Sequence, residues 1–263
     1  MDLANLFNFN YTAFLLGFGR ASGLLMVGPI FQSRSIPVQA RVLFAMALAL
    51  SVAPFIQIEA DLLQINTWMA AVIMIKEILI GLIMGFMANL AFYAFQIAGY
   101  LMDIEIGFGM VNIIDPFTGT EMPLLGQFNY LLAGLVFLAI NGHHRLILAL
   151  VQSFTYVKPG MFFLKPEATG VFLTAFTKMF LLGFKMSLPV LGAILLTDVA
   201  LGIIAKLLPQ INVFFLGFGI KIVVGILILT LFLPLYLVLI EETFARSGDT
   251  FRMLQLMLRR LTL

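Results

Sequence analysis

The chain has 263 residues, of which 62% are hydrophobic and only 11% are charged, whereas a soluble domain is about 45–50% apolar. This composition excludes a soluble globular protein, and it excludes a disordered chain more firmly still. The net charge of +2 comes from scattered basic residues, which predicts no nucleic-acid partner, and the lack of cysteine excludes disulfides, thiol catalysis and thiolate metal sites.

Six long apolar segments follow one another along the chain. They cover about residues 11–30, 42–58, 68–102, 129–154, 171–205 and 211–240. About 20 apolar residues in a helix cross the hydrocarbon core of a bilayer, which is roughly 30 Å thick. We therefore predict an all-α polytopic membrane protein with about six apolar helical segments arranged as helical hairpins.

Charges and glycines inside two of these segments predict close helix packing. Arg20 stands near the middle of the first segment, and because a charge at that depth is costly, we expect it to face protein or water. Small residues around it offer a face to a neighbouring helix, namely Gly17, Gly19, Ala21, Ser22 and Gly23. The third segment exceeds one simple span. In it, Glu77, Gly81 and Gly85 follow at i, i+4 and i+8, so they share a face on which backbones can meet.

Residues 99–128 lie between two long apolar runs and combine features that rarely occur together. They carry four acids and no Lys or Arg, and they contain too many Gly and Pro for a continuous helix. Yet several of their side chains are too apolar for an ordinary wet loop. An irregular segment beside membrane spans is tolerated only where it is buried in protein or lines a cavity. The residues themselves leave two interpretations open, a functional constriction or a connector that merely packs.

Other polar residues in the apolar segments favour packing over chemistry. His143 and His144 are neighbours, which point about 100° apart on a helix, and no carboxylate follows at i+3 or i+4. We therefore expect a polar cluster at a helix end and no metal site. Further charges lie in or beside the last two segments, where we favour a role in locking helices or facing a partner: Lys178, Lys185, Asp198, Lys206 and Lys221. No nucleophile-and-base set and no phosphate loop is visible, so we predict no catalytic residues and no cofactor.

The charge distribution fits a simple membrane topology poorly. The tail, residues 241–263, alternates apolar side chains with arginines and predicts an amphipathic helix for an interface or a partner. Six segments place both ends of the chain on one side, and the basic loop 31–41 belongs in the cytoplasm. The arginine-rich tail and the acidic central stretch then both break the positive-inside rule. Either these segments are docked in a larger assembly, or the number of spans is off by one.

Five pieces of the chain, in order and at matching spacing, resemble the FliR family of flagellar type III export-gate subunits, whose injectisome counterpart is SctT. The pieces are residues 19–41, residues 77–99, the pair Asp115 and Pro116, residues 141–144, and residues 198–225. The resemblance runs nearly end to end. Glu105, the Gly-Phe-Gly run at 107–109 and Gly219 depart from the family pattern, which affects fine geometry rather than membership.

The resemblance implies a subunit of a helical hetero-oligomeric export gate. In that gate, FliR joins FliP and FliQ in the bacterial inner membrane, at the centre of the flagellar basal body. Unfolded flagellar subunits cross the membrane there, and FlhB binds near the cytoplasmic entrance. Residues 1–160 would be a FliP-like helical hairpin part, and residues 161–263 a FliQ-like hairpin with the amphipathic tail. Spans of this family can lie above the bilayer plane, which would account for both departures from the positive-inside rule.

The resemblance also assigns roles to individual residues. The central loop of the family plugs the closed pore, and it maps onto residues 107–122. The implied pore-plug residues are Gly107, Phe108, Gly109, Met110, Val111, Ile113, Ile114, Asp115, Pro116 and Phe117. The implied cytoplasmic turn comprises Pro209, Gln210 and Asn212. Roles in helix packing or as buried charges are expected for Arg20, Glu77, Gly81, Gly85, Lys178, Lys185 and Lys221.

A polytopic transporter of a small solute is the main alternative function. Such a transporter needs discontinuous helices and a midplane ionisable site, often with internal repeats, and the two halves of this chain show no clear repeat. An intramembrane enzyme needs a convergent catalytic set, which the sequence does not display. Uptake by the purified protein alone in liposomes would favour the transporter.

Overall fold

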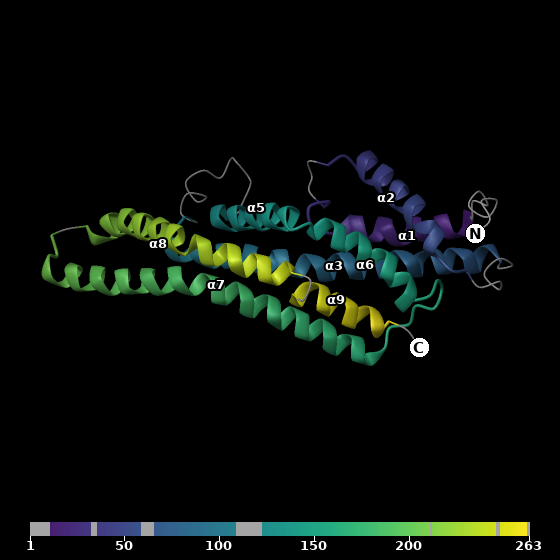
Figure 1. Ribbon diagram of the computed structural model, residues 1–263. Helices are drawn as coiled ribbons and strands as arrows, with labels where there is room; N and C mark the ends of the chain where they lie inside the picture. The colour runs from purple at the N-terminus through teal and green to yellow at the C-terminus, as the bar shows by residue number, and fades with distance from the viewer. Residues whose placement is uncertain are drawn as a thin grey trace. The chain divides into compact units, whose positions relative to one another are not determined.

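The computed structural model describes residues 11–32, 36–58, 66–108, 123–210, 212–245 and 248–261, and within these ranges it contains helices and no strand (Figure 1). The helices, in chain order, are α1 (Tyr11–Val27), α2 (Val38–Val52), the short 3₁₀ helix η2 (Ala53–Phe55), α3 (Thr67–Ile106), α5 (Leu124–Ala139), α6 (Gly142–Tyr156), α7 (Pro166–Leu207), α8 (Val213–Phe244) and α9 (Asp249–Arg259). The predicted all-α class is confirmed.

Several helices have the length and apolarity of membrane spans. In the described part of the chain, α2 with η2, α3, α7 and α8 are each long and apolar enough to cross a bilayer. The bent pair of α5 and α6 would make a fifth span, whereas α1 has only 17 residues. The chain is therefore a polytopic membrane protein. At 1.5 Å per residue, the 40 residues of α3 extend over about 60 Å, roughly twice the hydrocarbon core.

The chain packs into two compact units that cut across the sequence order. One unit comprises Met1–Leu90, Leu138–Ala175 and Phe244–Leu263, and the other comprises Ala91–Phe137 and Phe176–Thr243. The predicted boundary between residues 160 and 161 separates a FliP-like part from a FliQ-like part. It concerns likeness to those two proteins rather than packing, so it stays a proposal.

In the first unit, α1 packs against α2 and against the first half of α3, and α9 packs against α6. The predicted amphipathic helix of the tail is present as α9. Its apolar face is buried within this unit at Phe251, Leu254, Met257 and Leu258. The Phe163 N–H donates to the Leu261 carbonyl at 3.0 Å, which fastens the end of the tail. Its apolar stripe therefore covers the protein's own fold.

In the second unit, the last part of α3 contacts α5, α7 and α8 through glycines. A Cβ on Gly183 of α7 would lie 2.8 Å from the Ala94 carbonyl oxygen of α3, which requires glycine there. The sequence predicted that residues 99–128 form no continuous helix, and this is confirmed: α3 continues through Gly99 but ends at Ile106, and α5 begins at Leu124. Gly99 is needed for contact with α5, because a Cβ there would collide with the backbone of Leu125 and Gly126. Tertiary packing thus overrides the low helix propensity of this glycine.

Candidate functional site

Arg20 is completely buried, and its guanidinium joins three segments of the first unit. Nε donates to Glu77 Oε2 at 2.7 Å, and Nη2 lies 2.6 Å from the same oxygen. Nη1 donates to Ser153 Oγ at 2.8 Å, and Nη2 donates to the Val157 carbonyl at 3.0 Å. The guanidinium carbon also stands 3.8 Å from the centre of the Phe154 ring, which adds a cation–π contact. One side chain of α1 thereby binds α3, α6 and the residue that follows α6.

Two charged residues that are neighbours in the sequence of α3, Lys76 and Glu77, bind the loop after α6. Glu77 Oε1 accepts a hydrogen bond from the Gly160 N–H at 3.2 Å, and Lys76 Nζ donates to the Gly160 carbonyl at 3.1 Å. Gly160 has a φ of +79°, a left-handed conformation that glycine adopts at little cost. The backbone groups of one glycine are therefore fixed by two side chains of α3.

The extent of these contacts explains why the two charges are tolerated in a buried place. Removing an ion from water costs several kcal/mol, and an ion pair offsets this only with good geometry and further hydrogen bonds. All three nitrogens of Arg20 have partners. Lysine could not replace it, because only the planar fork of arginine reaches Glu77, Ser153 and Val157 together.

Glycines beside this ion pair let the backbones of α1 and α3 touch. A Cβ on Gly85 would lie 2.7 Å from the Leu24 carbonyl oxygen, and one on Gly81 would collide with the Arg20 carbonyl. On the opposite side of the contact, a Cβ on Gly23 would collide with the backbone of α3. Side chains at these positions would push the two helices apart. The shared face of Glu77, Gly81 and Gly85 thus lies against α1.

A second contact of this kind joins α3 and α5 in the second unit. Phe95, Gly99 and Asp103 follow one another at i, i+4 and i+8, and each meets α5. Asn129 Nδ2 donates to the Phe95 carbonyl at 3.3 Å. The Asp103 carboxylate accepts hydrogen bonds from the first turn of α5, with the Leu125 N–H at 2.9 Å from Oδ2. This carboxylate is only 4% exposed.

The charged residues of α7 and α8, for which a role in locking helices or facing a partner was predicted, lie in different surroundings. Lys221 of α8 and Asp198 of α7 form an ion pair at 2.7 Å, in which the two side chains are 24% and 41% exposed. Lys185 is exposed on α7 and Lys178 is half-buried. Lys206 is exposed in the last turn of α7. The Asp198–Lys221 pair joins α7 to α8, while Lys185 and Lys206 are exposed on α7.

The predicted cytoplasmic turn lies between α7 and α8. Pro209, Gln210 and Asn212 are all exposed. Asn212 Oδ1 accepts a hydrogen bond from the Phe215 N–H at 3.3 Å, so Asn212 caps the start of α8. Of the proposed pore-plug residues, only Gly107 and Phe108 are described, at the end of α3. The others, at positions 109–111 and 113–117, lie outside the described residues.

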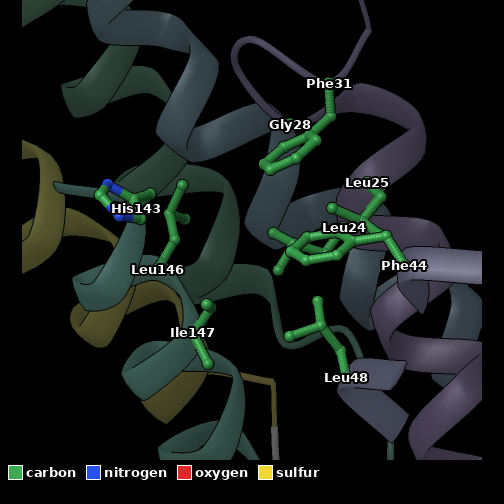
Figure 2. A pocket seen from close by; sticks show the side chains of 9 residues that line it. All are labelled: Leu24, Leu25, Gly28, Phe31, Phe44, Leu48, His143, Leu146 and Ile147. Carbon is green, nitrogen blue, oxygen red and sulfur yellow. The ribbon is translucent and has the colours of Figure 1, made fainter. Parts of the chain in front are cut away.

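The histidine pair stands at the start of α6, after Asn141, whose φ is +58°. His143 and Leu146 line an otherwise apolar pocket whose other wall comes from α1, from the segment that follows α1 and from α2, as Figure 2 shows. The His143 and His144 rings lie 4.2 Å apart. Within the described ranges, no three His, Asp or Glu residues gather as metal ligands.

Sequence reasoning missed several residues that complete these sites. Ser153, Val157 and Gly160 lie far from Arg20 in sequence, and no local pattern marks them. Asp103 was noted only as one of four acids. The spacing of Phe95, Gly99 and Asp103 repeats that of Glu77, Gly81 and Gly85, and this repeated period was the signal that could have found it.

The fold and the packing sites define a helical polytopic membrane protein, and comparison with known proteins gives its class. Residues 11–247 match the family model described as bacterial export proteins, family 1. The chain is 36% identical to the flagellar biosynthetic protein FliR of Bacillus subtilis over 245 residues, which cover 92% of this chain and 94% of that protein.

Two further relatives carry the same name. FliR of Aquifex aeolicus is 32% identical over 234 residues, with 88% of each chain covered. FliR of Escherichia coli is 30% identical over 226 residues, with 86% of each chain covered. The chain therefore belongs to the FliR family of flagellar biosynthetic proteins, and it resembles these export proteins along almost its whole length.

Proposed function

We propose that this chain is the FliR subunit of the flagellar type III export gate. With FliP and FliQ, it forms the channel through which unfolded flagellar subunits cross the bacterial inner membrane at the basal body. The observation that carries this proposal is the similarity to FliR of Bacillus subtilis over 92% of the chain. Homology over nearly the full length, rather than over one motif, favours the same place in the same assembly.

The surface of α7 and α8 supports a protein neighbour rather than lipid alone. Large apolar side chains are widely exposed there, including Phe215 at 82% and Leu196 at 72%. Lys185 and Lys206 are both exposed on α7, and a charge facing hydrocarbon is costly. Arg20 does not need such a neighbour, because Glu77 already pairs with it. We infer that partner subunits cover the region around Lys185 and Lys206.

We further propose that residues 107–122 plug the closed channel. The segment contains apolar residues that can exclude water and ions from a narrow lumen, and glycines that allow tight folding. A few kcal/mol of packing would keep it closed, so an entering polypeptide could displace it. Shortening the chain by deletion of residues 110–117 should leave the assembly intact but make it leak.

The same proposal places two other parts of the chain. Residues 1–160 correspond to a FliP-like part, and residues 161–263 to a FliQ-like hairpin. The turn with Pro209, Gln210 and Asn212 lies at the cytoplasmic entrance and contacts FlhB. All three side chains of the turn are exposed, which is compatible with such a contact.

Coexpression tests the proposal. An affinity-tagged chain is produced alone, with FliP, and with both FliP and FliQ, and the mass of the intact purified complex is measured. We expect degradation or aggregation of the chain alone, and a stable complex that contains all three proteins. A monodisperse monomer in mild detergent that takes up a small solute in liposomes would contradict the proposal and support the transporter.

A further inference from the structure

We propose that α9 and the α6–α7 loop, residues 157–165, form one surface that docks on the headgroups of anionic phospholipids. Both segments belong to the first unit. The inference goes beyond the proposed function, because it concerns the lipid around the protein rather than the subunits of the gate. It also concerns a different part of the chain from the region around Lys185 and Lys206.

The exposed face of α9 is basic. Arg252 and Arg259 follow at i and i+7, so they share a face, and both are exposed, as is Arg260 directly after the helix. Leu256 stands between the arginines, at i+4 from Arg252, and is 39% exposed. Arginines interleaved with an apolar side chain on the outer face are typical of a helix that lies in the plane of a membrane interface.

The α6–α7 loop exposes large apolar side chains between two lysines. Met161, Phe163 and Leu164 are 45%, 52% and 56% exposed, while Lys158 and Lys165 flank them in sequence. Exposed apolar residues that cluster, rather than occur singly, mark an interaction site. Such side chains can enter the boundary between headgroups and acyl chains, while the lysine ammonium groups stay among the headgroups.

Two contacts join the loop and the end of α9 into one surface. The Phe163 N–H donates to the Leu261 carbonyl at 3.0 Å, and this bond leaves the Phe163 side chain exposed. The guanidinium carbon of Arg259 lies 5.4 Å from the ring centre of Tyr156, at the end of α6. The two segments together contain five Lys or Arg residues and one Asp. The surface therefore combines positive charge with exposed apolar area.

The length of α8 brings α9 to the level of the headgroups. The 32 residues of α8 extend over about 48 Å, close to the roughly 40–45 Å of a bilayer with its headgroup regions. Because α9 begins five residues after α8 ends, a membrane-spanning α8 delivers it to the interface. An acidic protein would also match the arginines, but the exposed apolar residues of the loop favour a lipid surface.

The test uses the full-length chain, purified from membranes with the subunits that copurify with it and placed in phosphatidylcholine nanodiscs with graded fractions of phosphatidylglycerol. This chain has no cysteine, so Gln255→Cys, at an exposed position of α9, places one dye on it. A quencher attached to a trace of the lipid headgroups reports whether α9 is docked.

Three variants separate charge, arginine geometry and apolar contact. The glutamine variant, Arg252→Gln/Arg259→Gln/Arg260→Gln, removes the charges of the outer face. The lysine variant, Arg252→Lys/Arg259→Lys/Arg260→Lys, keeps these charges and is the matched control. The serine variant, Met161→Ser/Phe163→Ser/Leu164→Ser, removes the exposed apolar side chains and keeps the backbone bond from residue 163 to Leu261.

We expect quenching in the parent that rises with the phosphatidylglycerol fraction and weakens at high salt. A basic side chain near an anionic surface strengthens binding about fivefold. The glutamine variant should therefore need about tenfold more phosphatidylglycerol, or more, for the same quenching. The lysine variant should match the parent, the serine variant should be weaker, and all three should retain the copurifying subunits.

The inference is overturned if phosphatidylglycerol leaves the parent dye unquenched, or if the glutamine variant is quenched like the parent. It is also overturned if the glutamine variant loses a copurifying subunit, or if the lysine variant behaves like the glutamine variant. Either of these last two results would show that the arginines bind a protein. Docking by a chain that copurifies without FliP and FliQ would contradict the proposed function alone.

Discussion

The ion pair of Arg20 and Glu77 gives the sharpest prediction about stability. Arg20→Met removes every contact of the guanidinium and leaves the Glu77 carboxylate buried, with the Gly160 N–H as its remaining hydrogen bond. Removing one partner of a buried ion pair costs about 3–5 kcal/mol. We expect Arg20→Met to reach the upper end of that range, because a single N–H group compensates the charge that is left.

Glu77→Gln should cost less, at about 3 kcal/mol. The guanidinium would keep its hydrogen bonds to Ser153 and Val157 and its contact with the Phe154 ring. The double variant Arg20→Met/Glu77→Gln carries neither charge, so neither buried ion is left uncompensated. It should therefore be more stable than Arg20→Met alone, which gives a large coupling energy in the double-mutant cycle.

Denaturant unfolding of the complex purified in mild detergent measures these differences. A loss of 3 kcal/mol corresponds to about a hundredfold change in the unfolding equilibrium, and it should also appear as a lower complex yield. The reasoning is refuted if Arg20→Met costs less than about 1 kcal/mol, or if the double variant is at least as unstable as Arg20→Met.

Other predictions test the packing and the topology. Gly81→Ala should lower the stability and yield of the complex, because the added Cβ collides with α1. The control Gly134→Ala meets nothing within 4 Å and should be neutral or stabilise by up to about 1 kcal/mol. Equal behaviour of the two variants would contradict the contact between α1 and α3 at Gly81. Gly85→Leu should lower recovery of the complex and motility, and normal values of both would count against it. Gln210→Cys should crosslink to FlhB, and labelling from the periplasm alone would invert the topology.

The class and the helices were predictable from composition and from the length of the apolar runs. The sequence also indicated that Arg20 faces protein, since a charge inside an apolar helix has few other options. It could not name the partners, because Glu77 is 57 residues away and Ser153 is 133 residues away. The spacing of Gly81 and Gly85 predicted that they share a face for helix packing. Only the structure shows that the helix packed against this face is α1.

The end of α3 shows the limits of local rules most clearly. Gly99 lies inside the apolar run predicted for residues 68–102, but the sequence could not show that α5 packs against its backbone. The spacing could have marked Asp103 as a packing residue, but it could not name the first turn of α5 as its partner, because donor and acceptor are 22 residues apart. The tail was expected to serve an interface or a partner, and the apolar face of α9 instead covers its own unit. In each case a contact between distant segments decided the outcome.

The most direct test of the central claim is the ionic current through the purified complex with FliP and FliQ in a planar bilayer. The parent complex should be closed, and the complex with residues 110–117 deleted should conduct ions, with assembly of both shown by intact mass. An assembled deletion complex that stays as closed as the parent would contradict the account and would make the central segment a structural connector.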